Sequence, residues 1–287
     1  MTTQRTWRWL ALFVLVDLVL VAVMFRHVSG DSEDASSTSV ATAPGESAEV
    51  VDPAPAAETV AGLVEATEDL TVWGARGSCG SGSPVVLTRD DAGVREELDP
   101  GITELLRLDV NDAGDVYVIG ADADCQPLEL LLTEGATAWI DPPGPIRRWH
   151  LTPGDPTTLT TPVGVVDPGC APVSFVSDDA EGLVGCADGR IRTSDDDGAT
   201  WEGDVALESL RSVVRAGDDA VALAPAEDCA VGSYRVAAGS AAFSGCVQPE
   251  ESEGLTLLAA SGGGYVAVVG EELIRSTDGS TWEPVGS

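Results

Sequence analysis

A short basic and aromatic cluster is the part of this sequence best suited to recognising a ligand. It lies at residues 141–169, a stretch dense in Pro, Gly and Thr, and consists of Arg147, Arg148, Trp149 and His150. Exposed Trp and Arg side chains contribute much of the energy in many interfaces, so these four are candidate binding residues. The alternative is that Ile146–Leu151 forms an outer strand whose Trp149 packs inward. The sequence leaves both interpretations open.

Acidic residues are abundant, but none forms a recognisable catalytic or metal-binding pattern. The triplet Asp195–Asp197 lacks the ligand spacing of a calcium loop, so we expect one turn acid with two solvated neighbours. His150 is the only histidine beyond residue 30, and without a G-x-S-x-G elbow it does not indicate a Ser-His-Asp triad. So many acids supply numerous accidental carboxylate pairs, and no pair stands out. We therefore assign no catalytic residue, no metal and no cofactor.

Charge is distributed very unevenly along the 287 residues. The 15 basic residues are all Arg and face 48 acids. Residues 1–30 carry a net charge of +2 and the rest −35, which gives the −33 of the whole chain. So acidic a region repels nucleic acid and anionic lipid headgroups, and we expect no nucleic-acid partner. Solubility explains the acidity most simply; adaptation to high salt and binding of cations or a basic partner are the alternatives.

The cysteines indicate an oxidising compartment. All six lie beyond residue 30, namely Cys79, Cys125, Cys170, Cys186, Cys229 and Cys246. The chain has no C-x-x-C pair and only two histidines, so a zinc site is not expected. An even number of dispersed cysteines behind an export signal indicates disulfides, although the count alone leaves many pairings open.

The N-terminal region predicts a membrane anchor. Residues 9–28 are apolar apart from Asp17 and the closing Arg26 and His27, and residues 1–8 are basic. The apolar length approaches the roughly 20 residues that cross a bilayer as a helix, and the positive charge keeps residues 1–8 in the cytoplasm. We interpret 9–28 as an uncleaved transmembrane signal-anchor, with a cleaved signal peptide as the alternative. Asp17 is either a contact with another membrane helix or a tolerated acid.

Residues 29–59 predict a disordered acidic stalk between the anchor and a folded domain. They are rich in Ser, Ala, Thr, Pro, Glu and Asp and contain no aromatic residue. Such a composition cannot bury a core. The expected arrangement is a single-pass protein of the cell membrane, whose C-terminal domain at residues 60–287 is extracytoplasmic.

A hairpin pattern repeats through residues 60–287. Each copy has an apolar strand, a turn that contains an acid or glycine, and a second apolar strand. The copies are Val60–Gly74, Leu105–Gly120, Val173–Gly185, Leu210–Ala224 and Leu257–Gly270. A third strand is expected after each, at Pro84–Thr88, Leu128–Thr133, Arg190–Ser194, Ser233–Ala238 and Leu273–Ser276.

The spacing of these copies predicts the fold. Successive hairpins end 39 to 65 residues apart, and the longest step contains residues 141–169, which we interpret as an insertion. A short fourth strand is expected in each repeat. Four strands in about 40–50 residues is typical of propeller blades, so we predict an all-β fold, a β-propeller of five or six four-stranded blades.

Two similar corners follow third strands and end on a tryptophan. The first contains Ser194, Asp196, Gly198, Thr200 and Trp201, and the second contains Ser276, Asp278, Gly279, Thr281 and Trp282. An Asp side chain accepts hydrogen bonds from nearby backbone amides, and glycine adopts the positive φ of a tight turn. The tryptophan buries a large ring. Thr133–Trp139 and Thr88–Gly93 are partial copies, and the fourth repeat has no recognisable copy.

These corners resemble the Asp-box, or BNR, repeats of propellers of the sialidase, sortilin and photosystem-assembly-factor type, which share a WD40/YVTN-like architecture. In that family the box lies between the third and fourth strands of a blade, and here both corners begin where a predicted third strand ends. The resemblance covers about residues 60–287. It implies that the corner residues are structural and lie away from the ligand.

The cysteines occupy related positions in this layout. Cys79, Cys125 and Cys229 lie at equivalent ends of second strands, whereas Cys170 precedes the first strand of its blade and Cys186 ends the second. We therefore predict disulfides Cys79–Cys125 between adjacent blades, Cys170–Cys186 and Cys229–Cys246.

The resemblance does not choose between binding and catalysis, since the family includes enzymes, receptors and assembly factors. Sialidases use three arginines, a Tyr–Glu nucleophile pair and an acid/base Asp, and usually carry an R-I-P stretch. Here Pro145-Ile146-Arg147 has the wrong order, and Tyr117 and Tyr265 lie on second strands as packing residues. We predict a non-catalytic binding or scaffold propeller for a cell-surface protein or carbohydrate. An exo-glycosidase of sialidase type is the alternative, and a sensor ectodomain acting through Asp17 is a third.

Overall fold

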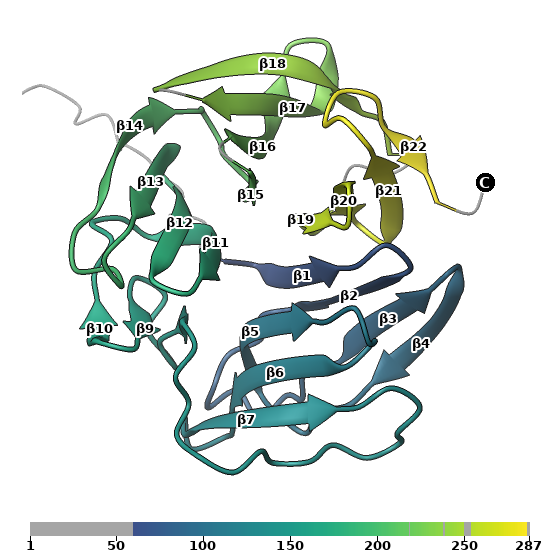
Figure 1. Cartoon of the computed structure of the whole chain (residues 1–287), viewed down its shortest axis with the longest axis vertical. Coiled ribbons are helices and arrows are strands. Elements are labelled where there is room, and N and C mark those ends of the chain that lie inside the picture. The colour runs from purple at the N-terminus through teal and green to yellow at the C-terminus, as the bar shows by residue number, and fades with distance from the viewer. Residues whose placement is uncertain (1–59, 218, 238, 250–253, 286–287) are drawn as a thin grey trace, which may run out of the picture. The chain divides into compact units, whose positions relative to one another are not determined.

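The described residues form strands, turns and loops only. The computed structural model describes residues 60–217, 219–237, 239–249 and 254–285 (Figure 1). The predicted cytoplasmic segment 1–8, anchor 9–28 and stalk 29–59 lie outside these residues. Within the described part of the chain, no helix has the length and apolar character needed to span a membrane.

Six antiparallel sheets surround a central axis, so the domain is a six-bladed β-propeller (Figure 1). Each blade uses consecutive strands, and we number the blades I to VI along the chain. Blade I contains β1 (Gly62–Ala66), β2 (Leu70–Ala75), β3 (Leu87–Asp91) and β4 (Val94–Leu98). Blade IV contains β11 (Pro172–Asp178), β12 (Glu181–Cys186), β13 (Arg190–Ser194) and β14 (Glu202–Ala206).

Blades V and VI also have four strands. Blade V contains β15 (Ser212–Ala216), β16 (Asp219–Ala226), β17 (Cys229–Ala237) and β18 (Ser240–Val247), and blade VI contains β19 (Thr256–Ser261), β20 (Gly264–Val269), β21 (Glu272–Ser276) and β22 (Glu283–Pro284). Blade II has three strands, β5 (Glu104–Val110), β6 (Val116–Ala121) and β7 (Pro127–Leu132), and an isolated bridge from Leu131 to Ile140 stands in for the fourth. All five predicted hairpins therefore appear as paired strands.

Blade III lies inside the stretch that the sequence indicates as an insertion. It consists of β8 (His150–Leu151), β9 (Leu159–Thr161) and β10 (Gly164–Val166). Strands of two or three residues are too short to show the alternation by which strands are recognised, which is why the repeat pattern passes over this blade. The predicted count of five or six blades agrees with the six observed, and the stretch interpreted as an insertion at residues 141–169 contains a shortened third blade.

The ring closes without a strand shared between its first and last blades. Strand β1 lies beside β19, and each sheet keeps to its own stretch of chain. Two arginines join the blades instead. Arg275 of blade VI donates from Nη1 to the Glu68 carbonyl at 2.6 Å, and Arg95 of blade I donates from Nη1 to the Glu271 carbonyl at 3.0 Å. These hydrogen bonds and a buried apolar cluster that includes Val64, Trp73 and Val266 therefore join the two blades in place of a shared strand.

Aliphatic side chains fill the spaces between blades, as expected for a chain with few aromatic residues. Leu87, Leu105 and Val118 are among the fully buried members of the cluster between blades I and II. Three disulfides add to this packing, and all three predicted pairs are confirmed: Cys79–Cys125, Cys170–Cys186 and Cys229–Cys246. In the chain-entropy account, the two shorter loops, of 16 and 17 residues, stabilise the fold by about 3 kcal/mol each and the 46-residue loop by about 4 kcal/mol.

The first tryptophan corner is a compact hydrogen-bonded turn between β13 and β14. Ser194 Oγ accepts from the Gly198 amide at 2.9 Å. Asp196 accepts from the Thr200 amide at 2.8 Å and from the Thr200 hydroxyl at 2.7 Å. These bonds from Thr200 hold the pKa of Asp196 below its ordinary value. The carboxylate is thus used to shape the turn.

The second corner repeats this arrangement between β21 and β22. Ser276 Oγ accepts from the Gly279 amide at 2.9 Å, and Asp278 Oδ1 accepts from the amides of Thr281 at 2.9 Å and Ser280 at 2.8 Å. These bonds, led by the one from Thr281, lower the pKa of Asp278 strongly. Trp282 donates from Nε1 to Ser233 Oγ of blade V at 3.2 Å. This corner therefore also joins two blades.

The partial copies keep the turn but lose the full network. In Thr133–Trp139 the Ala136 amide donates to the Thr133 carbonyl at 2.9 Å, and Trp139 still packs against the core of blades I and II. Thr88–Gly93 forms the β3–β4 hairpin, where Asp90 Oδ1 accepts from the Gly93 amide at 2.9 Å. The position of a corner in a blade is thus preserved where its sequence is not.

Candidate functional site in the central cavity

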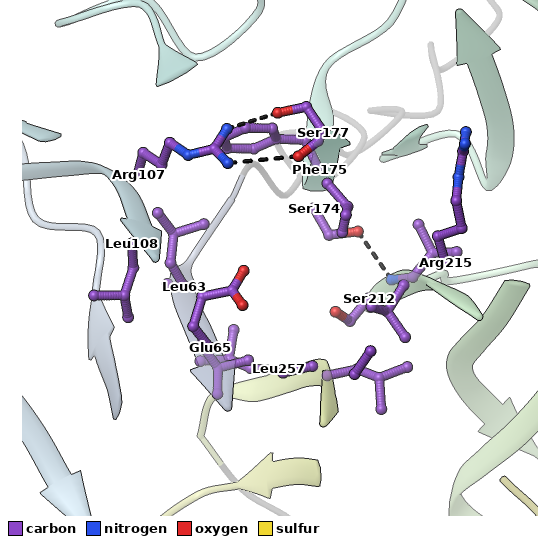
Figure 2. Close-up of a pocket in the computed structure, with 18 of the residues that line it drawn as sticks. Leu63, Glu65, Arg107, Leu108, Ser174, Phe175, Ser177, Ser212, Arg215 and Leu257 are labelled. Atoms are coloured by element: carbon purple, nitrogen blue, oxygen red, sulfur yellow. Dashed lines mark hydrogen bonds between the residues drawn. The ribbon is translucent and has the colours of Figure 1, made fainter. Parts of the chain in front are cut away.

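The first strands of five blades enclose a cavity of about 210 Å³ on the propeller axis (Figure 2). Strands β1, β5, β11, β15 and β19 supply its lining, and the short β8 of blade III supplies none of it. Apolar walls come from side chains that include Leu63, Leu108, Phe175 and Leu257. The charged lining residues are Glu65, Arg107, Asp109 and Arg215. The cavity thus combines aliphatic walls with a small number of charges.

Arg107 is held by four short hydrogen bonds. Its Nε and Nη2 donate to the two oxygens of Asp109 at 2.6 and 2.7 Å, because residues two apart on β5 face the same side. Its Nη1 donates to Ser177 Oγ of blade IV at 2.6 Å and to the Trp149 carbonyl beside blade III at 2.9 Å. Arg107 therefore ties blades II, III and IV together at the cavity wall.

Arg148, one of the four candidate binding residues, joins the same network. Its Nη1 donates to Asp109 Oδ2 at 2.9 Å, and its Nε lies 3.8 Å from Glu129 Oε1. The guanidinium carbon lies 4.5 Å from the ring centroid of Tyr117, which is a cation–π contact. The side chain remains 41% exposed. Asp109 thus accepts hydrogen bonds from one arginine of the cavity lining, Arg107, and from one arginine of the loop, Arg148.

Trp149 and His150 are buried, which favours the alternative in which this segment packs inward over the one in which they are exposed binding residues. Trp149 is 2% exposed, donates from Nε1 to the Asp179 carbonyl at 3.1 Å, and meets the Trp201 ring edge-on at 5.9 Å. A Cβ on Gly182 would lie 2.6 Å from the Trp149 ring, so this glycine makes room for it. A blade of such short strands needs one large side chain to fill its core.

His150 belongs to the same core. It is 4% exposed and donates from Nδ1 to the Arg148 carbonyl at 2.8 Å. Burial lowers the pKa of His150, since the imidazolium loses its hydration there. Arg147 is exposed. Binding by Arg147 and Arg148 stays a prediction, and the two buried residues act as packing groups.

Glu65 differs from every other charged residue of the cavity. Its carboxyl points into the space between Ser174 and Ser212 (Figure 2), and no hydrogen bond joins it to any described residue. Arg215, the remaining cation of the lining, is paired with Glu181. Burial raises the pKa of Glu65 to about 8, with the negative charge of Asp109 adding to the shift and Arg107 opposing it. Glu65 is therefore a largely protonated, unpartnered acid at neutral pH.

The sequence did not single out Glu65, Arg107 or Asp109. A signal existed for the last two, because opposite charges two apart on a strand lie on one face and can pair. No comparable signal existed for Glu65, whose place on the axis follows only from ring closure. The Asp195–Asp197 triplet supplies the turn acid Asp196, as expected. Within the part of the chain that the structure describes, no group of three His, Cys, Asp or Glu side chains is arranged to hold a metal ion.

Comparisons with known proteins bear on the fold alone. No family model and no curated protein matches the sequence. Similar solved structures include the SapL1 lectin in complex with alpha methyl fucoside, 10% identical over 79% of this chain and 95% of that chain, with a TM-score of 0.48. YCF48 from Cyanidioschyzon merolae is 14% identical over 81% and 73%, with a TM-score of 0.31. A Trypanosoma rangeli sialidase complex is 12% identical over 79% and 47%, with a TM-score of 0.34.

Proposed function

We propose that this chain is a non-catalytic, extracytoplasmic binding propeller that takes a small ligand in its central cavity. Its tryptophan corners are those of an Asp-box propeller, and residues 9–28 and 29–59 serve as membrane anchor and stalk. All six cysteines are paired, which supports export to an oxidising compartment. Protease added to intact cells is expected to remove the propeller and spare the N-terminal segment; full protection would contradict this orientation.

The hydrogen bonding of Asp109 carries the proposal. Retaining and inverting glycosidases need two carboxyl groups, one as acid and the other as nucleophile or base. Glu65 and Asp109 are the two acids of the cavity lining. Both oxygens of Asp109 accept hydrogen bonds from Arg107, and Oδ2 accepts a further one from Arg148. A carboxylate so engaged cannot attack a sugar or activate water without first breaking these contacts.

The arginines of the cavity also differ from those of a sialidase-like site. A cluster that binds a substrate carboxylate needs guanidinium groups free of protein acids. Here Arg107 is paired with Asp109, and Arg215 with Glu181. No tyrosine belongs to the lining. The cavity therefore offers one free acid and no free cation, which suits binding better than glycoside hydrolysis.

An exo-glycosidase is the second candidate, favoured by the presence of two acids in one cavity. A panel of fluorogenic glycosides tests it, with the full chain in detergent at pH 5 to 8. We expect no turnover above that of the Glu65→Gln variant. Turnover in the parent that disappears in both Glu65→Gln and Asp109→Asn would overturn the binding function and establish the hydrolase.

A further inference from the structure

Among the described residues that line the central cavity, Glu65 is the one ionisable group without a partner. Arg107 and Arg148 both donate to Asp109, and Glu129, 3.8 Å from Arg148, supplies the second negative charge, while Arg215 is joined to Glu181. Glu65 makes no hydrogen bond to a described residue. An unpaired ionisable group in an enclosed site is costly in the charged form. A ligand that brings the missing positive charge removes this cost, which gives the cavity a chemical preference.

The surroundings of Glu65 favour a cation over an anion or a second acid. The titratable side chains that face the cavity are Arg107 and Asp109 from β5 and Arg215 from β15, whereas the lining parts of β11 and β19 contribute none. Because both arginines are paired, neither is free to bind an anion. Burial and the charge of Asp109 raise the pKa of Glu65 to about 8. A cation close to the carboxyl acts in the opposite direction and favours the ionised form.

The walls of the cavity define the remainder of the ligand. The cavity lining includes Leu63, which lies on the same face of β1 as Glu65, together with Leu108 and Leu257, whose side chains belong mainly to the cores between blades. The hydroxyls of Ser174 and Ser212 flank the space into which the carboxyl points (Figure 2). Ser174 Oγ already accepts from the Val213 amide at 3.0 Å. A volume of about 210 Å³ suits a short chain of a few carbons, not an oligomer. An ammonium nitrogen would meet the acid and serine oxygens while its hydrocarbon chain meets the leucines.

The charge of the whole domain supports the same preference. Residues 60–287 carry 12 Arg against 40 acids, a net charge of −28, and an acidic surface raises the local concentration of small cations. We propose that the central cavity binds a small alkylammonium ligand, whose nitrogen pairs with the Glu65 carboxylate and whose hydrocarbon part lies against the leucine walls. This proposal rests on the proposed binding function and narrows its ligand class. Binding below the pKa of Glu65 exchanges its proton for the cation, so one proton is released to solvent for each cation taken up.

Calorimetry with butylammonium on the full chain in detergent tests the proposal. We expect binding that releases close to one proton per ligand at pH 6.5, measured in two buffers of different ionisation enthalpy. The affinity should rise by about tenfold per pH unit up to pH 8, because the proton competes with the cation. Butanol has the same carbon chain without the charge and is expected not to bind. Shortening butylammonium to ethylammonium should weaken binding by roughly fourfold per methylene.

Two variants distinguish the effect of Glu65 on binding from the effect of the overall negative charge of the surface. Glu65→Gln keeps size and shape and should lower the butylammonium affinity by at least about thirtyfold. Glu68→Gln removes an exposed acid of the same blade outside the cavity and should leave affinity and proton release unchanged. The two-buffer measurement on the parent protein needs no variant, so it decides the case even where a substitution impairs folding. A lysine side chain is a second source of the same group, and N-acetyl-lysine methylamide in place of butylammonium shows whether the cavity accepts it.

The outcomes distinguish this inference from the function on which it rests. Binding of butylammonium without proton release, or equal binding by Glu65→Gln, would show that the cavity acid is not the site. Binding of neutral methyl glycosides in the cavity, with no binding of ammonium ions, would overturn the ligand class and keep the binding function. Turnover of glycosides that depends on Glu65 and Asp109 would overturn both.

Discussion

The tryptophan corners and the central cavity use the same functional group in opposite ways. At the corners, Asp196 and Asp278 accept hydrogen bonds from backbone amides and neighbouring hydroxyls, and these bonds lower the pKa of each carboxyl. In the cavity, Glu65 accepts none, and burial raises the pKa of its carboxyl to about 8. The acids of the conspicuous motif are occupied in shaping turns. The acid that is free for a ligand lies in an ordinary strand.

The largest effect expected from this contrast is an opposite dependence of stability on pH. For Glu65 the pKa is higher in the folded state than in the unfolded chain, where it is near 4.5. The folded protein therefore holds the proton more tightly, and stability falls as the pH rises from about 4.5 to about 8. Replacing Glu65 with Gln removes this loss. One pKa unit corresponds to about 1.4 kcal/mol. Between pH 5 and pH 9 the free energy of unfolding of Glu65→Gln should therefore rise by roughly 4 kcal/mol relative to that of the parent.

The corner acid Asp278 makes stability depend on pH in the opposite direction. Its pKa is lowered in the folded state from an ordinary value near 3.8, so its contribution is complete above that value and is lost as the pH falls below it. Asp278→Asn should destabilise the protein at pH 7 and destabilise it less at pH 2, where part of the contribution of Asp278 has been lost. Urea unfolding of the parent, Glu65→Gln and Asp278→Asn across this range measures both slopes. If the unfolding free energy had the same pH dependence in all three proteins, the cavity acid and the corner acid would not differ in the way proposed.

The second expected effect concerns Trp201, which connects a corner to blade III. Its ring meets the Trp149 ring edge-on at 5.9 Å in the cluster between blades II, III and IV. Trp201→Ala leaves a cavity there, and the expected loss is about 3 kcal/mol of unfolding free energy. Butylammonium binding to the folded fraction should stay unchanged, since the corner lies outside the cavity lining. Thermal unfolding and calorimetry on the same sample measure the two quantities.

Phe243 provides the matched control for that substitution. Its ring is 54% exposed on blade V, so Phe243→Ala removes an aromatic side chain without opening a large internal cavity. A change of less than about 1 kcal/mol is expected. Equal losses for Trp201→Ala and Phe243→Ala would mean that the corner tryptophan is not a packing anchor.

The hairpins and disulfides were predictable because their signals are local. A turn acid or glycine between two apolar runs predicts a hairpin, and Leu257–Gly270 appears as β19 and β20 for that reason. The pairing Cys79–Cys125 followed from equivalent positions in neighbouring repeats, and the structure confirms it. Because the repeats are equivalent, a local sequence pattern also predicts a contact between residues that are far apart in the sequence.

Blade III and the cavity could not be predicted in the same way. Strands as short as His150–Leu151 carry no periodicity, and the burial of Trp149 depends on the room that Gly182 leaves on a neighbouring blade. Glu65 is a single polar residue in an apolar strand, and such residues usually face solvent. Its place on the axis is fixed by contacts of β1 with β5 and β19, which no stretch of sequence encodes alone.

Arg148 gives the smallest expected effect and the sharpest test of where a ligand binds. Its side chain is 41% exposed, and exposed ion pairs contribute little stability, so Arg148→Ala should change the unfolding free energy by less than about 1 kcal/mol. The substitution removes a positive charge beside Asp109, which makes the cavity more negative. Butylammonium affinity should therefore rise by about twofold at low salt and less at high salt.

Arg147→Ala is the control for Arg148→Ala, because it removes the same charge from the adjacent exposed position without touching Asp109. It should leave the affinity within error of the parent. If the butylammonium affinity rises for Arg148→Ala alone, the loop acts on the cavity through Asp109, as the hydrogen bond of 2.9 Å between Arg148 and Asp109 implies. A loss of binding in both arginine variants, with Glu65→Gln unaffected, would place the ligand on the loop. The basic cluster would then be the binding site, and the cavity acid would be a destabilising group with no ligand to offset its cost.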